Sequence, residues 1–141
     1  MPFSSRLKRL FTKPDISKMI DESGSTRDVG QAMELIAQQH LQTHGLTLVK
    51  RNYTCKFGEV DLIVKEQDTF VFVEVKYRQS TQFGGAIHAV SPSKQQKIIK
   101  TAQFYLQQSN LNEYNTCCRF DVVAIEGSAT RPDITWLKNA F

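Results

Sequence analysis

Hydrophobic and polar residues follow the pattern of two β-strands in the middle of the chain, at residues 58–64 and 69–76. Both segments are rich in β-branched and aromatic side chains, which pack well on the surface of a sheet. Glu66, Gln67 and Asp68 lie between them and suit a hairpin turn. The pattern therefore predicts an antiparallel hairpin at the centre of the fold.

Two-residue alternation assigns the side chains of this hairpin to opposite faces. It places Phe72, Glu74 and Lys76 opposite Val71, Val73 and Val75 in the second strand, and Glu59, Asp61 and Ile63 opposite Val60, Leu62 and Val64 in the first. Strands this apolar are expected to be buried on both sides. Carboxylates and an ammonium are costly there unless they are paired or hold a metal. The hairpin is therefore where a functional site is expected.

The remaining segments predict two helices and three further strands. The first helix is expected to begin at Asp28, where Gln31 completes a capping box, and to end at Gly45. The second is expected to begin with Ser91 as N-cap and Pro92 in its first turn. The other strands are expected at residues 46–53, 119–125 and 134–137. The order α-β-β-β-α-β-β indicates an α/β fold with a mixed sheet and a helix on each face.

The composition is that of one globular domain with a tail. The chain has 141 residues, of which 40% are hydrophobic and 23% charged. Residues 1–26 hold five basic and three acidic side chains around Pro14 and a Ser-Gly-Ser break, so they are expected to be a flexible tail or an arm that touches phosphates. Residues 27–141 are expected to form the folded domain.

Charge and cysteine content narrow the class of partner and the compartment. No segment has the roughly 18 apolar residues of a membrane span, and none has the features of a secretory signal, which predicts a cytoplasmic protein without a membrane partner. The three cysteines lack metal-binding spacing and fit free thiols in a reducing compartment. The net charge of +4 and the isoelectric point near 9.0 favour an anionic partner, with nucleic acid first.

Asp61 and Glu74 are the residues of the hairpin that point to chemistry. Antiparallel pairing brings them close together, and two carboxylates about 4 Å apart repel by roughly 4 kcal/mol at an effective dielectric near 20. A divalent cation removes that repulsion, and ligation by oxygen alone suits Mg²⁺ or Mn²⁺. Lys76 would then hold a water or neutralise a phosphate, as in phosphodiester hydrolysis. The alternative is a half-exposed sheet face with a Glu74–Lys76 ion pair worth under about 1 kcal/mol.

Other polar residues leave two interpretations each. Glu34, at the edge of the apolar stripe of the first helix, is either solvated or leans toward the acidic strands. Lys94, Lys97 and Lys100 form a basic ridge that is either solvated or touches phosphates. Asp121 suits a hydrogen-bonding residue near a strand end better than a carboxylate supporting the site. A further pair, His40 and His44, has metal-like spacing, but the first lies in the apolar stripe and suits the core.

A wider set of motifs adds a resemblance. Asp61 followed by Glu74-Val75-Lys76 resembles the signature of the PD-(D/E)xK nuclease superfamily, which has the restriction-endonuclease-like fold. Together with residues 58–63, 73–78, 83–86, 91–95, 118–124 and 136–141, it resembles the YraN-like family of small bacterial proteins over residues 28 to 141. The resemblance implies an αβββαβ core related to archaeal Holliday-junction resolvases and a role with nucleic acid.

The resemblance also implies a set of site residues. Asp61, Glu74 and Lys76 match the signature, and Glu34 matches the family's first-helix glutamate. Two departures are Val60, where the superfamily often has proline, and Met33, where a glycine is common. With the acidic set intact, the metal site is expected to be competent.

These observations lead to one favoured hypothesis, a metal-dependent endonuclease or resolvase-like phosphodiesterase. Asp61 and Glu74 would ligate Mg²⁺ or Mn²⁺, Glu34 would add a ligand directly or through water, and Lys76 would position the attacking water. Arg78, Lys94 and Lys97 would contact the phosphates of the nucleic acid, which is expected to be DNA. A homodimer would let two sites cut two strands, although nothing in the sequence requires one. The alternatives are a nucleic-acid-binding module without turnover and a domain that serves only protein assembly.

Overall fold

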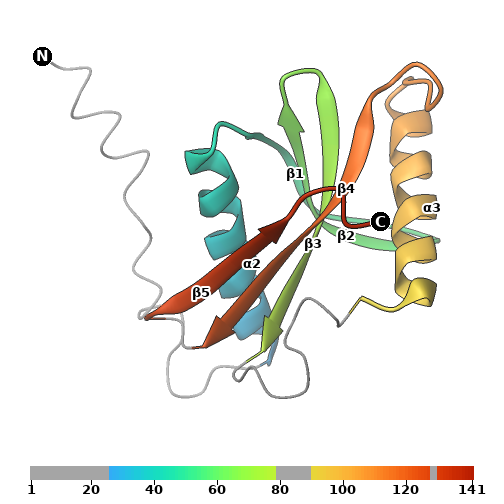
Figure 1. Ribbon diagram of the computed structural model, residues 1–141. Coiled ribbons are helices and arrows are strands. Elements are labelled where there is room, and N and C mark those ends of the chain that lie inside the picture. Colours follow the sequence, from blue (N-terminus) through green and yellow to red (C-terminus); the bar gives the residue numbers. More distant parts are fainter. Residues whose placement is uncertain (1–25, 79–89, 128–129) are drawn as a thin grey trace, which may run out of the picture.

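Five strands form one sheet with a helix against each face (Figure 1). The computed structural model describes residues 26–78, 90–127 and 130–141. The elements are α2 (Thr26–Thr43), β1 (Thr47–Cys55), β2 (Gly58–Glu66), β3 (Thr69–Arg78), α3 (Pro92–Gln108), β4 (Cys118–Gly127) and β5 (Pro132–Leu137). This confirms the predicted order and the α/β class, and the arrangement is that of a restriction-endonuclease-like core. None of the helices within the described residues is long and apolar enough to cross a membrane.

The sheet is mixed, as predicted, and its strands lie in chain order from β1 to β5. Neighbouring strands are antiparallel except for β3 and β4, which are parallel in a register that pairs Phe70 with Cys118 and Arg78 with Glu126. A parallel pair needs a crossover, and α3 supplies it. Apolar side chains of β2, β3 and β4 pack on both faces of the sheet.

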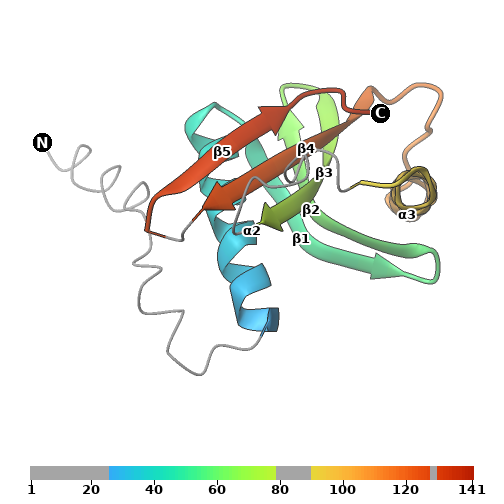
Figure 2. The same cartoon turned by 60° about the horizontal axis from the view of Figure 1, so that its bottom comes forward.

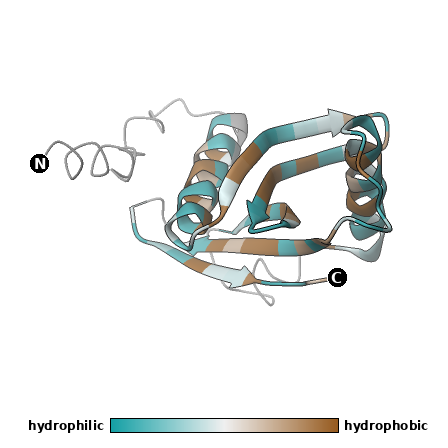
Figure 3. Ribbon diagram, turned by 90° about the horizontal axis from the view of Figure 1, so that it is seen from above, coloured by the Kyte–Doolittle hydropathy of each residue, from teal (hydrophilic) through white to brown (hydrophobic). Residues whose placement is uncertain are grey.

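Two apolar clusters hold the helices to the sheet. The cluster under α2 contains Met33, Ile36, Ala37 and Leu41 from the helix and Leu62, Val64, Val71, Val73, Val123 and Ile125 from the strands. The cluster under α3 contains Ile98, Ala102 and Leu106 from the helix and Tyr53, Val60, Ile63 and Phe72 from the strands. Figure 3 shows apolar positions recurring along both helices and along the strands between them. Burial of these side chains is the main favourable contribution to folding.

The helix ends follow the local signals in part. Ser91 caps α3, because its Oγ accepts a hydrogen bond of 3.2 Å from the backbone N–H of Lys94, and Pro92 begins the helix as predicted. Gly45, with a φ of +91°, ends the turn after α2. The predicted cap at Asp28 is wrong, since Asp28 lies inside the first turn of α2. The predicted tail at residues 1–26 falls almost wholly outside the described residues.

The strands β2 and β3 separate at the predicted site. They pair only from Leu62 opposite Val73 to the turn, whereas β1 and β2 stay paired as far as the next hairpin turn. Beyond Leu62 the β1–β2 hairpin lies against α3 (Figures 1 and 2). Alternation predicted that Val60 shares a face with Leu62 and Val64, and this prediction is wrong. Val60 packs under α3 with Ile63, whereas Leu62 and Val64 pack under α2. Asn52, with a φ of 51°, breaks strict alternation in the neighbouring strand.

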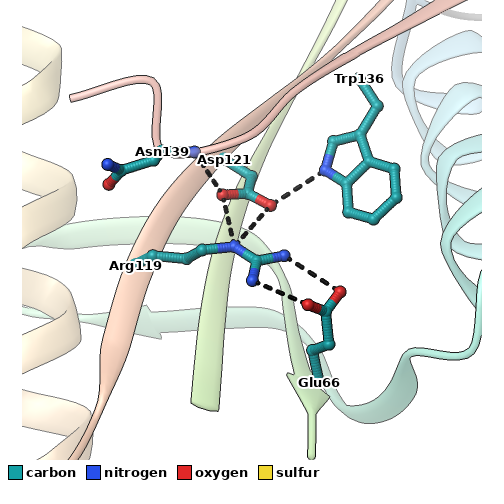
Figure 4. Close-up of polar contacts among 5 residues, drawn as sticks. All are labelled: Glu66, Arg119, Asp121, Trp136 and Asn139. Atoms are coloured by element: carbon teal, nitrogen blue, oxygen red, sulfur yellow. Dashed lines mark hydrogen bonds and ion pairs between the residues drawn. The ribbon is translucent and has the colours of Figure 1, made fainter.

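A polar cluster joins the C-terminal strand to the sheet (Figure 4). Asp121 is fully buried and accepts hydrogen bonds from Trp136 Nε1 and the Asn139 backbone N–H, each at 2.9 Å. Arg119 donates to Asp121 at 3.1 Å through Nε, and its two other nitrogens bond Glu66 at 3.2 and 3.3 Å. These contacts confirm Asp121 as a hydrogen-bonding residue. They engage both oxygens of the Asp121 carboxylate with Arg119, Trp136 and Asn139, none of which is a predicted site residue.

Candidate active site where β2 and β3 separate

Asp61 is held at the point where β2 and β3 part. Its Oδ2 accepts a hydrogen bond of 2.8 Å from the backbone N–H of Val75. The β2–β3 ladder has ended here, so the carboxylate takes the place that a strand carbonyl would have filled. The side chain is thus fixed by the sheet itself.

Glu74 follows on β3 and is the most deeply buried of the predicted site carboxylates. Only 4% of the residue is exposed. Its Oε1 lies 3.5 Å from Lys76 Nζ and 3.8 Å from Lys94 Nζ, so two ammonium groups from different elements meet on one oxygen. Its Oε2 is buried and has no hydrogen-bond partner within the described residues. An unpartnered oxygen in such a place is costly and marks a position suited to a cation.

Asp61 and Glu74 interact directly, as the hairpin pattern predicted. Burial and the charge of Asp61 raise the pKa of Glu74 from 4.5 to about 7, against the opposing effect of Lys94 and Lys76. Burial also raises the pKa of Asp61, while the hydrogen bond from Val75 acts in the opposite direction. When Glu74 is protonated its carboxyl can donate a hydrogen bond to Asp61. The pair therefore retains a proton near neutral pH unless a cation replaces it.

Glu34 approaches Asp61 from α2. Its Oε2 is buried and has no hydrogen-bond partner within the described residues. Burial, followed by the charges of Asp61 and Glu59, raises the pKa of Glu34 to about 7, and a hydrogen bond with Asn52 opposes that rise. Of the two interpretations left by the sequence, the structure supports the one in which Glu34 leans toward the acidic strands.

The donor set fits a hard divalent cation. Glu34, Asp61 and Glu74 offer only oxygen, and two of them carry a buried oxygen without a partner. Within the described residues, no three acidic, histidine or cysteine side chains are close enough to enclose a metal by themselves. Mg²⁺ does not require such an enclosure, since proteins usually hold it through one or two carboxylates while water and phosphate supply the rest. Asp61 and Glu74 would be its direct ligands, and Glu34 the outer one.

The three predicted phosphate-binding residues differ in their surroundings in the structure. Lys94 is in the site, bound to Glu74, although the sequence suggested only a contact with phosphates. Lys97 is exposed on α3 and Arg78 is exposed at the end of β3. Sequence reasoning missed Asn52, whose only signal was an asparagine inside a strand pattern. The rings of His40 and His44 contact Trp136, the indole that donates to Asp121.

Comparison with known proteins places the chain among relatives of similar length. The profile of a family described as "Uncharacterised protein family UPF0102" matches residues 33–125, which include all of the predicted site residues. A UPF0102 protein of Colwellia psychrerythraea is 54% identical over 125 residues, covering 89% of this chain and 97% of the relative. Relatives from Nitrosococcus oceani and Stutzerimonas stutzeri are 44% and 47% identical, covering 82% and 79% of this chain and 92% of each relative. The chain therefore belongs to the uncharacterised protein family UPF0102, the YraN family expected from its motifs.

Proposed function

We propose that this protein is a metal-dependent phosphodiester hydrolase that cuts nucleic acid, with DNA as its expected substrate. The observation that carries the proposal is the buried Oε2 of Glu74, which has no hydrogen-bond partner within the described residues although the other oxygen of the same carboxylate faces two lysines. A purely structural role would leave this arrangement unfavourable, because the two buried carboxylates, Asp61 and Glu74, repel one another and Glu74 Oε2 has no donor within the described residues. A divalent cation and a phosphate would complete it.

Each residue of the site has a definite task in such a reaction. A Mg²⁺ held by Asp61 and Glu74, with Glu34 as an outer ligand, would supply Lewis-acid stabilisation of the charge on the phosphate. Lys76 would orient the attacking water, whose oxygen forms the new bond to phosphorus while a P–O ester bond breaks. Asp61 is held in place by the Val75 N–H, so its orientation does not depend on the substrate.

Positive side chains around the carboxylates support binding of a phosphate chain. Lys94 would leave Glu74 and contact a phosphate oxygen once the carboxylate has another cation to bind. Arg78, at the end of β3, and Lys97, on α3, are exposed and would contact neighbouring phosphates. The net charge of +4 adds a general attraction to nucleic acid.

The proposal is tested by measuring metal binding and cleavage separately. Isothermal titration of Mn²⁺ should give saturable binding to the wild type and none to the variant that combines Asp61→Asn with Glu74→Gln. Branched, flapped and single-stranded DNA substrates should be cut only when Mg²⁺ or Mn²⁺ is present. Lys76→Ala should keep DNA binding and lose cleavage, and unchanged cleavage in this variant would overturn the role given to Lys76.

A second candidate function is a nucleic-acid-binding module without turnover. It is favoured by the observation that no three ligands close around a metal position within the described residues. This function predicts salt-sensitive retention of DNA that is indifferent to Asp61→Asn, and no cleavage of any substrate with either metal.

A further inference from the structure

One face of α3 extends from the carboxylates to the turn between β1 and β2. Lys94, Lys97, Thr101 and Phe104 recur along the helix at the spacing of a single face. The first of them contacts Glu74, as described above. Farther along, a Cβ added at Gly58 of the hairpin would lie 3.7 Å from the Lys97 Cβ and 3.3 Å from the Thr101 Oγ1. The hairpin therefore lies against this face of the helix.

The end of this face is aromatic and basic. Phe57, in the turn between β1 and β2, packs edge-on against Phe104 with ring centroids 5.8 Å apart. Lys56 places its Nζ 5.2 Å from the centroid of Phe57 and 5.8 Å from that of Phe104. Phe57 remains 40% exposed, and the side chains of Lys56 and Lys97 are exposed as well. We call Lys56, Phe57, Lys97 and Phe104 the α3–hairpin strip.

The backbone of the turn does not require an aromatic residue. Neither Lys56 nor Phe57 has a positive φ, so many residue types would fit both positions. A large apolar ring left exposed beside a lysine resembles the stacking positions of proteins that bind single strands, where bases stack on aromatic rings and basic groups contact the backbone. Charge and ring together therefore favour a nucleic acid with unpaired bases.

The strip lies within a few nucleotides of the candidate active site. Four residues of strand separate Phe57 from Asp61, which is about 13 Å at the rise of a strand. Ten residues of helix separate Phe104 from Lys94, which is about 15 Å at the rise of a helix. With nucleotides stacked roughly 3.4 Å apart, this distance corresponds to about four nucleotides.

We propose that the α3–hairpin strip binds a single-stranded segment of nucleic acid, with a base stacked on Phe57 and phosphates on Lys56 and Lys97. The strand would continue along α3 to the phosphate placed at the carboxylates. This part of the inference rests on the proposed function, whereas binding at the strip does not. The substrate would then be a single strand or a duplex with a splayed arm, instead of uninterrupted duplex.

Fluorescence anisotropy tests the strip without cleavage. The full chain is titrated in EDTA against labelled 15-mers of oligo(dT) and oligo(U) and against a 15-base-pair duplex. Phe57→Leu keeps an apolar contact with Phe104 and loses the stacking ring, so it should weaken single-strand binding at least about fivefold, with little change for the duplex. Phe57→Trp should restore binding. Lys56→Gln should lower the dependence of log K on log salt by about 0.7.

A matched control separates this position from cation–ring contacts in general. Lys65 also places its Nζ over a phenylalanine, 4.8 Å from the Phe70 centroid, but at the other end of β2. Lys65→Gln should therefore bind oligo(dT) as the wild type does. The proposal would be overturned if Phe57→Leu bound oligo(dT) like the wild type, or if it lost as much affinity for the duplex as for oligo(dT). It would also be overturned if Lys65→Gln lost as much affinity for oligo(dT) as Lys56→Gln. The ratio of oligo(dT) to oligo(U) affinity identifies which nucleic acid the strip prefers.

These affinities, compared with the Mn²⁺ titration and the cleavage assay, distinguish the two proposals. If the strip binds oligo(dT) while Mn²⁺ does not bind the carboxylates, the proposed hydrolase fails and the strip stands. If Lys76→Ala abolishes cleavage while Phe57→Leu binds normally, the strip fails and the hydrolase stands. Thermal unfolding of each variant should match the wild type, so that a loss of binding is not a loss of fold.

Discussion

Asp61 accepts a hydrogen bond from the backbone N–H of Val75, at the position where β2 has stopped pairing with β3. One carboxylate thus closes the edge of a separating sheet and also faces Glu74. The role in the fold needs an oxygen that accepts the hydrogen bond, whereas the proposed role in metal binding needs the negative charge. Substitutions can therefore separate them.

Asp61→Asn should fold and should not bind metal. Its amide oxygen can still accept the Val75 hydrogen bond, and removing the charge relieves the repulsion with Glu74. Asp61→Leu leaves the Val75 N–H without an acceptor, so it should lower the free energy of unfolding by about 1–3 kcal/mol. Urea unfolding of the metal-free proteins measures the stability of both variants. Equal stability of the two variants would contradict this role of Asp61.

The metal-free protein should lose stability as the pH rises from about 4.5 to about 7. Glu74 has a folded-state pKa of about 7 against 4.5 when unfolded, so its contribution is fully present below 4.5 and is lost as the pH passes 7. A raised pKa at Glu34 acts in the same direction. Glu74→Gln should be less dependent on pH and more stable at pH 8 by up to about 3 kcal/mol, because the pKa of Glu74 differs by about 2.5 units between the two states and each unit corresponds to about 1.4 kcal/mol.

Glu66 provides the control for that pH dependence, because its pKa is displaced in the opposite direction. Arg119 lowers the pKa of Glu66, so its contribution is present above the unfolded pKa and lost as the pH falls. Glu66→Gln should leave the fall between pH 4.5 and 7 intact. A wild-type protein whose stability rises steadily over that range would contradict the raised pKa of Glu74.

Lys94→Ala should bind Mn²⁺ more tightly than the wild type when no nucleic acid is present. Lys94 Nζ lies 3.8 Å from Glu74 Oε1 and competes with a cation for the same carboxylate. Removing a partly exposed ion pair of up to about 1 kcal/mol should raise the affinity roughly three- to fivefold. Isothermal titration measures this change, and Lys97→Ala on the same helix is the control. Weaker Mn²⁺ binding in Lys94→Ala would exclude competition.

Asp121→Ala should destabilise the fold without altering metal affinity in the folded protein. It leaves Arg119 and Trp136 without their buried acceptor, a loss expected to be about 3–5 kcal/mol. Trp136→Phe removes a single donor and should cost about 1 kcal/mol. Guanidinium unfolding ranks the two variants. A smaller loss in Asp121→Ala than in Trp136→Phe would contradict the network.

The sequence was most informative where local patterns decide the structure. The hairpin, the apolar stripes of the helices and the cap formed by Ser91 and Pro92 follow from periodicity and backbone preferences, and all were confirmed. Close contact of Asp61 with Glu74 also followed from the count of residues on each side of a turn.

Contacts between elements that are distant in the sequence could not be predicted from local patterns. Val60 was assigned to the wrong face because no local signal shows that two paired strands will part. Lys94 was placed on a surface ridge because its approach to Glu74 depends on how α3 docks. Periodicity left Glu34 at the edge of a stripe, and only the family motif and then the packing of α2 settled its direction.

The parallel ladder between β3 and β4 has a consequence for the order of folding. Its first pair joins Phe70 to Cys118, with the whole of α3 between them, whereas β1, β2 and β3 are joined by short turns. Closing the longer loop costs more chain entropy, so the three-stranded meander should form before α3 docks. Asp61 and Glu74 belong to the early unit and Lys94 to the late one. The acidic half of the site should therefore exist before its basic half arrives, and a divalent cation present during folding would meet the carboxylates first.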